Sequence, residues 1–104
     1  MHLRHARDAE GRPIAIAVDA DSAPFAAFLT EEVHWTAYAE TLLSGARAGA
    51  SAEAATGNAY AVEFADEMVT VEHLHLPDRP PLRLHSADFI AAMTAWRDFL
   101  IGNP

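Results

Sequence analysis

A helical repeat near the C-terminus is the feature that most limits how this chain can fold. Four large apolar residues recur there at helical spacing: Phe89, Met93, Trp96 and Leu100. At 3.6 residues per turn their side chains share one face, which predicts a helix that packs on a core through that face. Ser86 is a favourable N-cap, Asp88 puts a carboxylate in the first turn, and the Gly-Asn-Pro sequence at 102–104 is a stop signal.

A second, longer helix is predicted from Pro24 to Leu43. Asp21 or Ser22 can accept its free amide protons, Pro24 suits its first turn, and Ser44-Gly45 and Gly49 are expected to end it. Its apolar residues fall on two adjacent stripes, one with Phe25, Leu29, Val33 and Leu43, the other with Phe28, Trp35, Tyr38 and Leu42. Together the two stripes span a wider arc than packing on one side of a helix requires.

Alternating apolar residues predict a first β-hairpin near the N-terminus. Its strands run over 2–7 and 13–19 and are joined by a polar turn that contains Gly11. In the second strand, Ile14, Ile16 and Val18 alternate with two alanines. One face of this strand is therefore apolar, and the other carries only small groups and can lie under a helix.

A second hairpin is predicted over residues 59–64 and 68–76. In its return strand, Val69 and Val71 would point to one face of the sheet, whereas Leu74 and Leu76 would point to the other. Pleat parity cannot change within a regular strand, so we expect a β-bulge or two-sided burial near Glu72 and His73. Prolines then interrupt the pattern, and Leu82 to His85 is expected to add a short edge strand.

These elements predict one α+β domain over residues 1–104. The expected architecture is an antiparallel sheet of four to five strands, formed by the two hairpins and the edge strand. A long central helix and the C-terminal helix pack on this sheet.

The charge balance limits the classes of partner. The chain has 15 acidic against 7 basic residues, a formal net charge of −8, which repels nucleic acid and anionic lipid and attracts cationic surfaces. It contains no cysteine, which excludes disulfides and thiolate metal sites, and no apolar stretch of membrane-spanning length. We therefore expect a cytoplasmic protein that binds neither nucleic acid nor membranes.

Two histidines form the one candidate metal site in the sequence. His73 and His75 are separated by one residue on a predicted strand, so both point to the same face and could ligate one zinc or nickel ion. A site needs further ligands, and Glu63, His85 or the pair His2 and His5 could supply one. The alternative interpretation is that these histidines are solvated.

Two carboxylates on the long helix also raise a chemical question. Glu32 follows Glu31 and falls inside the apolar arc, where poor solvation would tune it as a general acid or base. The alternative is a structural ion pair with Arg4, Arg83 or Arg97. The chain has no serine-nucleophile elbow, glycine-rich phosphate loop or zinc-protease motif, so the familiar catalytic signatures are absent.

The second stripe of the long helix is a candidate interface. Trp35, Tyr38 and Leu42 widen the apolar arc, and aromatic residues are enriched where proteins meet partners. This stripe could form a partner or dimer contact. Equally, it could be buried between the sheet and the C-terminal helix.

In the order of its elements, the chain resembles the YacL-type family of small uncharacterised bacterial proteins. The resembling stretches are 7–18, 31–33, 57–71 and 87–100, the last with Trp96 and Phe99. The resemblance implies the α+β fold. It suggests no particular activity, because the function of that family is not established. In size and charge the chain also looks like some immunity proteins of bacterial competition systems.

These observations favour a non-enzymatic, acidic protein that binds another protein, in the manner of an immunity protein or a chaperone, or that forms a homodimer. No cofactor is expected. The alternative function is a small metal-binding protein or metal-assisted enzyme that uses His73 and His75.

Overall fold

The computed structural model describes residues 2–102 and has the α+β architecture expected from the sequence. The strands are β1 (Leu3–Arg7), β2 (Pro13–Ala17), β3 (Ala55–Thr56), β4 (Tyr60–Phe64), β5 (Met68–His73) and β6 (Leu82–His85). The helices are α1 (Ala23–Glu32), α2 (Thr36–Ala48) and α3 (Ser86–Leu100), with short 3-10 turns at Ala20–Ser22 and Gly49–Ser51.

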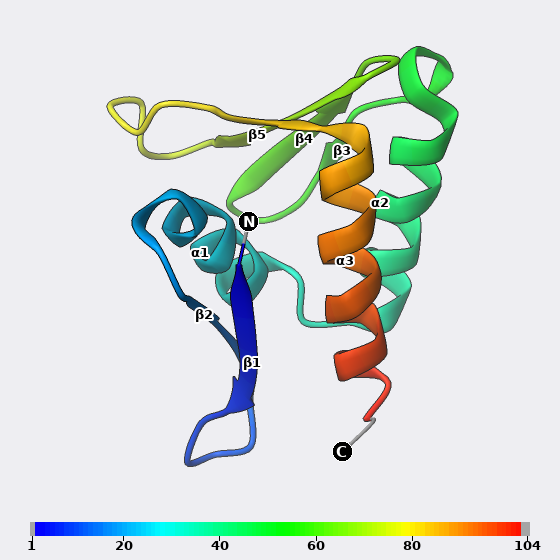
Figure 1. The fold of residues 1–104 in the computed structure, drawn as a ribbon. Coiled ribbons are helices and arrows are strands. Elements are labelled where there is room, and N and C mark those ends of the chain that lie inside the picture. The colour runs from blue at the N-terminus through cyan, green and yellow to red at the C-terminus, as the bar shows by residue number, and fades with distance from the viewer. Residues whose placement is uncertain (1, 103–104) are drawn as a thin grey trace.

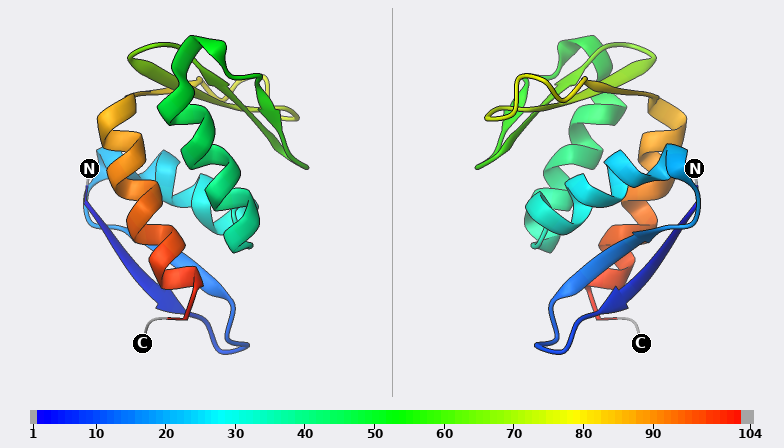
Figure 2. Two further views of the ribbon diagram at one scale, coloured as in Figure 1. Left: turned by 90° about the vertical axis from the view of Figure 1, so that its right-hand side faces the viewer. Right: turned by 90° about the vertical axis from the view of Figure 1, so that its left-hand side faces the viewer.

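The three helices and the two sheets enclose one apolar core. In Figure 1, α2 and α3 lie side by side, and the four-stranded sheet crosses one end of this helix pair. Helix α1 and the hairpin β1–β2 lie beside the pair. Figure 2 shows the same arrangement from the two flanks. The buried core draws on all three helices and on β4 and β5.

The C-terminal helix is confirmed, and its predicted stripe is the part that enters the core. Phe89, Met93 and Trp96 of α3 are fully buried. The predicted cap is wrong: the N-cap is His85, and the hydroxyl of Ser86, the first helical residue, is buried with no hydrogen-bond partner among the described residues. Gly102 follows with φ +95, whereas the rest of the predicted stop signal, Asn103 and Pro104, lies outside the described residues.

The predicted long helix is wrong in one respect: it is broken into α1 and α2 at residues 33–35. Val33 leaves the helical conformation and Trp35 is extended. The break has a physical reason, because one straight helix would have left one of its two apolar stripes uncovered. After the break each helix has its own direction, and both present their apolar faces to the same core. The buried residues are Phe25, Phe28 and Leu29 of α1 and Ala39, Leu42 and Leu43 of α2.

The ends of this helical region also differ from the prediction. Pro24 lies in the first turn of α1 as expected, but the hydroxyl of Ser22 does not cap the helix. Instead it accepts a hydrogen bond from the backbone N–H of His2 at 2.9 Å and donates one to Asp19 at 2.8 Å. Helix α2 continues past Gly45, and the ring of Phe64 packs against this glycine where any other residue would place a Cβ. The helix ends at Ala48, and the expected stop at Gly49 is confirmed, with φ +65.

The strands form two separate antiparallel sheets. The hairpin β1–β2 stands alone, and the other sheet has the order β3-β4-β5-β6. The second hairpin and the short edge strand of the prediction are therefore confirmed, whereas the first hairpin does not join them in one sheet. Helix α1 packs on β2, and the N–H of Ala15 donates to the hydroxyl of Thr30 at 2.9 Å. The small face of β2 thus lies under a helix, while Ile16 and Val18 are 40% and 60% exposed.

No β-bulge is present in the described strand β5. Its register with β4 is regular from Val69 opposite Phe64 to His73 opposite Tyr60. The parity change seen in the sequence has a different cause, since the strand ends at His73 and Leu74 and Leu76 lie beyond it. Both leucines are 44% exposed.

Candidate functional site

The break between α1 and α2 brings a large aromatic side chain to the surface. Trp35 is 74% exposed and is the most exposed of the large apolar residues that the structure describes. Trp35 is the N-cap of α2 and has an extended backbone. Its side chain therefore does not share the direction of the core-facing side chains of α1 and α2, and it stays outside the core. An exposed tryptophan is unusual in a folded domain and is enriched in contacts between proteins.

On one side of Trp35 lies a hollow of about 690 Å³. We call it the hairpin hollow; it is lined by Asp8, Glu10, Gly11, Arg12, Pro13, Ile14, Thr30, Glu31, His34 and Trp35. Its walls therefore come from the turn between β1 and β2, from the start of β2 and from the end of α1. The break residues His34 and Trp35 complete it.

The polar turn of the hairpin is fixed by its own hydrogen bonds. The carboxylate of Asp8 accepts the N–H groups of Glu10 and Arg12 and the guanidinium of Arg12, each at 2.9 Å. The backbone N–H of Arg12 and then its guanidinium lower the pKa of Asp8. Arg12 also lies 3.3 Å from Glu10, so this cation is shared by two carboxylates and the rim of the hollow stays acidic.

On the other side of Trp35 lies a smaller hollow of about 320 Å³, which we call the polar hollow. It is lined by Glu31, Glu32, His34, Trp35, Tyr38, Thr56, Gly57 and Asn58. The hydroxyl of Tyr38 is buried and has no hydrogen-bond partner among the described residues. Burial, and then the charge of Glu32, raise the pKa of Tyr38.

Glu32 makes a structural contact, but not one of those predicted. Its carboxylate accepts three backbone N–H groups, from Asn58 at 3.1 Å, Ala59 at 2.9 Å and Tyr60 at 2.6 Å. None of the three arginines considered from the sequence is its partner. The end of α1 is thereby fastened to the turn before β4, and Gly57 lies so close to this carboxylate that a Cβ there would meet it at 2.7 Å.

Glu31 belongs to a second contact that sequence reasoning missed. The hydroxyl of Tyr60 donates to Glu31 at 2.7 Å and accepts from Arg79 at 3.0 Å. Burial, and then the hydrogen bond to Glu31, raise the pKa of Tyr60 to about 12. Tyr60 stands 29 residues and Arg79 48 residues from Glu31, so no local spacing in the sequence could have indicated this group.

The predicted metal pair does not find a third ligand. The rings of His73 and His75 are 6.1 Å apart, and within residues 2–102 no group of three or more histidine or carboxylate side chains could hold a metal ion. Nδ1 of His73 accepts the N–H of His75, and Nε2 of His75 lies 3.1 Å from the carbonyl of Asn58. Glu63 and His85 pair with Thr70 and Met68, farther along the sheet.

The predicted interface stripe is divided by the break. Leu42 is fully buried in the core, so its assignment to a surface is wrong. Tyr38 is half-buried and lines the polar hollow, and Trp35 remains on the surface. In the folded chain Trp35 lines the same hollow as Pro13 and Ile14 of β2. Local spacing in the sequence does not indicate these neighbours.

Comparisons with known proteins do not assign this site. No protein-family model, curated protein or solved structure matches the chain. The resemblance to the YacL-type family therefore stays a prediction. In the part of the chain that the structure describes, no helix has the length and apolar character needed to cross a bilayer.

Proposed function

We propose that this chain acts by binding another protein, and that the contact is centred on Trp35. The observation that carries the proposal is the exposure of this indole, 74%, between two hollows that together offer space for partner side chains. Binding energy in protein interfaces concentrates in a few aromatic or arginine residues surrounded by less important contacts. Trp35 has the character of such a residue.

The chemistry around Trp35 favours a cationic partner segment. The carboxylates of Asp8, Glu10 and Glu31 border the hairpin hollow, and the whole chain carries a net charge of −8. An arginine or lysine of the partner could lie over the indole and meet a carboxylate at the same time. Pro13 and Ile14 supply the apolar wall for the neighbouring side chain. We infer a basic protein partner, as expected of an immunity-like or chaperone-like factor.

The proposal is tested by substitutions at matched exposed positions. Trp35→Asp places a charge in the centre of the contact, and Val18→Asp makes the same change at another exposed apolar position that lines neither hollow. Each tagged variant is incubated with extract of the native host, and the retained proteins are quantified. We expect a basic protein that is retained by the wild type and by Val18→Asp and is lost with Trp35→Asp.

Two further measurements complete this test. Far-ultraviolet circular dichroism must show that Trp35→Asp is folded, since an unfolded variant would place Trp35 in the core and contradict the proposal. Sedimentation of the wild type distinguishes a second copy from a different partner. A dimer that Trp35→Asp converts to a monomer would show that the surface serves self-association; equal retention by all three proteins would refute the proposal.

A further inference from the structure

The outer edge of β1 has unpaired backbone groups. In an antiparallel pair, hydrogen-bonded and non-hydrogen-bonded residue pairs alternate. The N–H of Val18 donates to the carbonyl of His2, and the N–H of Asp8 donates to that of Arg12, which fixes the alternation along the hairpin. Leu3, His5 and Arg7 therefore direct their N–H and C=O groups away from β2. No described residue bonds to these groups.

The other sheet edges are obstructed by comparison. On β2 the corresponding groups of Ala15 bond to the hydroxyl of Thr30, and Pro13 has no N–H to offer. Strands β3 and β6 are short, with two and four residues, and Pro80 and Pro81 lie directly before β6. Folded proteins commonly protect sheet edges by such means, because an open edge can pair with another chain. The edge of β1 has no comparable protection within residues 2–102.

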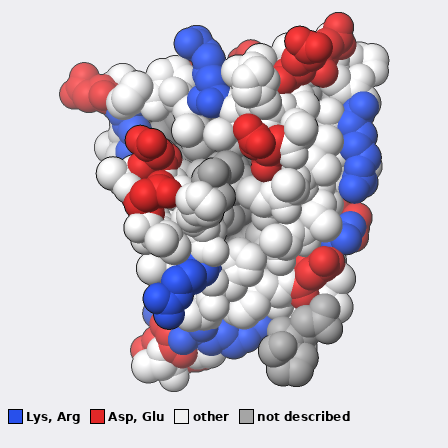
Figure 3. All heavy atoms as spheres, viewed as in Figure 1, with Lys and Arg blue, Asp and Glu red and all other residues white. Residues whose placement is uncertain are grey.

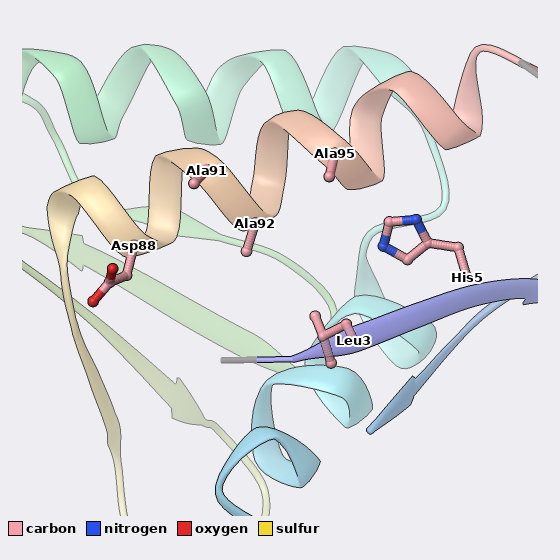
Figure 4. Close-up of a pocket in the computed structure, with 6 residues that line it drawn as sticks. All are labelled: Leu3, His5, Asp88, Ala91, Ala92 and Ala95. Atoms are coloured by element: carbon pink, nitrogen blue, oxygen red, sulfur yellow. The ribbon is translucent and has the colours of Figure 1, made fainter. Parts of the chain in front are cut away.

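A groove runs between β1 and α3. It has a volume of about 280 Å³ and is lined by Leu3 and His5 of β1 and by Asp88, Ala91, Ala92 and Ala95 of α3. Figure 4 shows the alanines and the side chain of His5 turned toward the space between the strand and the helix. His5 closes one end of the groove, because its ring packs on the rings of Trp96 and Phe99, with centroid distances of 5.4 and 5.3 Å.

We propose that the edge of β1 accepts an extended segment of another protein as an added strand, with alternate side chains of that segment in the groove against α3. In this mode of recognition, backbone hydrogen bonds give affinity and pockets for every second side chain give specificity. The side chain opposite His5 faces the alanines and is apolar and small. The added strand also enlarges a two-stranded sheet, which is a marginal structure by itself.

Charge selects an acidic segment as the occupant. Arg4 lies on the face of β1 opposite His5, is exposed, and makes no ion pair with any residue that the structure describes. Arg7 is also exposed and bonds to the carbonyl of Gly11. The groove itself carries one carboxylate, that of Asp88, which lies at the end away from His5 (Figure 4), and most of the surface between β1 and α3 in Figure 3 is uncharged. Carboxylates at the positions that flank Arg4 would complete this pattern.

A second copy of the chain fits less well. Two β1 strands that pair antiparallel about His5 would place Arg4 opposite Ala6, so the two copies of Arg4 become diagonal neighbours on one face, where their like charges repel. The occupant we infer is therefore a segment of a different protein in which apolar and acidic residues alternate. This contact involves β1 and α3, so it does not depend on the Trp35 surface.

The test uses a synthetic octapeptide of alternating valine and glutamate and, for comparison, one of alternating valine and lysine. Amide hydrogen exchange is followed by NMR on the full chain. We expect the glutamate peptide to slow exchange at Leu3, His5 and Arg7 by about tenfold or more, because these amides gain hydrogen bonds. The lysine peptide should leave them unchanged.

Two variants and one control complete the experiment. Arg4→Glu should weaken binding of the glutamate peptide and favour the lysine peptide, and Ala95→Leu should block both by filling the groove. Ala37→Leu, at an exposed alanine of α2, should bind as the wild type does. Unchanged exchange at the three amides, or equal protection by both peptides, would overturn the proposal. Protection that rises with protein concentration and without peptide would identify a second copy as the occupant and overturn it as well.

Discussion

The indole N–H of Trp96 donates a hydrogen bond to the carbonyl of Val33 at 2.8 Å, and this contact joins the C-terminal helix to the break between α1 and α2. Val33 has left the helix, so its carbonyl has no partner one turn later. The indole supplies that partner within the core. The position of Trp35 at the surface therefore depends on Trp96, which lies 63 positions from Val33 in the chain.

Replacing Trp96 should lower the free energy of unfolding through two effects, the loss of its hydrogen bond and the cavity left by its side chain. Trp96→Phe keeps an aromatic ring but leaves the buried Val33 carbonyl without its donor, for an expected loss of about 1–3 kcal/mol. Trp96→Ala also opens a cavity, and we expect a loss of roughly 3–5 kcal/mol. Urea unfolding measures both, and a loss under about 1 kcal/mol for the alanine variant would contradict the buried position of the indole.

The carboxylate of Glu32 should matter for stability through its charge as well as its shape. Glu32→Gln keeps the size but removes the charge that three backbone N–H groups share, so we expect a loss of about 1–3 kcal/mol. The matched control is Glu63→Gln, at an exposed position on β4, which should change stability by less than about 0.5 kcal/mol. Equal effects at the two positions would show that the contact with residues 58–60 contributes nothing.

Gly45 should reverse the usual effect of an alanine substitution. In an open helix, Gly→Ala stabilises by up to about 1 kcal/mol. Here the added methyl would overlap the ring of Phe64, and we expect a net loss of about 1–3 kcal/mol. A double-mutant cycle with Phe64→Ala should remove most of that loss; a stabilised Gly45→Ala single variant would show that the ring moves freely.

The tyrosines should titrate at unusually high pH. Burial and Glu31 raise the pKa of Tyr60 from 10.0 to about 12, so the folded state favours its neutral form. The stability that this shift contributes is complete below pH 10.0 and is lost as the pH rises toward 12. Absorbance titration of Tyr38→Phe isolates Tyr60. Adding Glu31→Gln should lower its pKa, and an ordinary value in Tyr38→Phe would refute the buried contact.

The elements of this fold were largely predictable because their signals are local. The stripe of α3, the alternation in β4 and the short strand before α3 each follow from residues within one segment. The break at residues 33–35 has no such signal, since no proline or glycine lies there. Its cause is the competition of two apolar stripes for one core, together with the distant Trp96, and neither is visible at local spacing.

The candidate site was predictable only in part for the same reason. Trp35 could be identified because it belongs to a second apolar stripe beside the core-facing one. The burial of Leu42, by contrast, depends on the direction that α2 takes after the break. The partners of Glu31 and Glu32 lie 26 or more residues away in sequence. Only the folded chain brings the hairpin turn to Trp35.

The division of the strands between two sheets has a consequence for the energetics of substitution. Hairpin β1–β2 and the sheet β3–β6 share no strand, and α1 packs on the hairpin while α2 contacts β3 and β4. Substitutions on distant elements without shared partners have additive free energies, whereas residues in contact are coupled. Changes at Ile16 and at Val62 should therefore add. Changes at Trp96 and His5 should not add, because the indole of Trp96 contacts the ring of His5 in the hairpin and also the carbonyl of Val33 at the helix break.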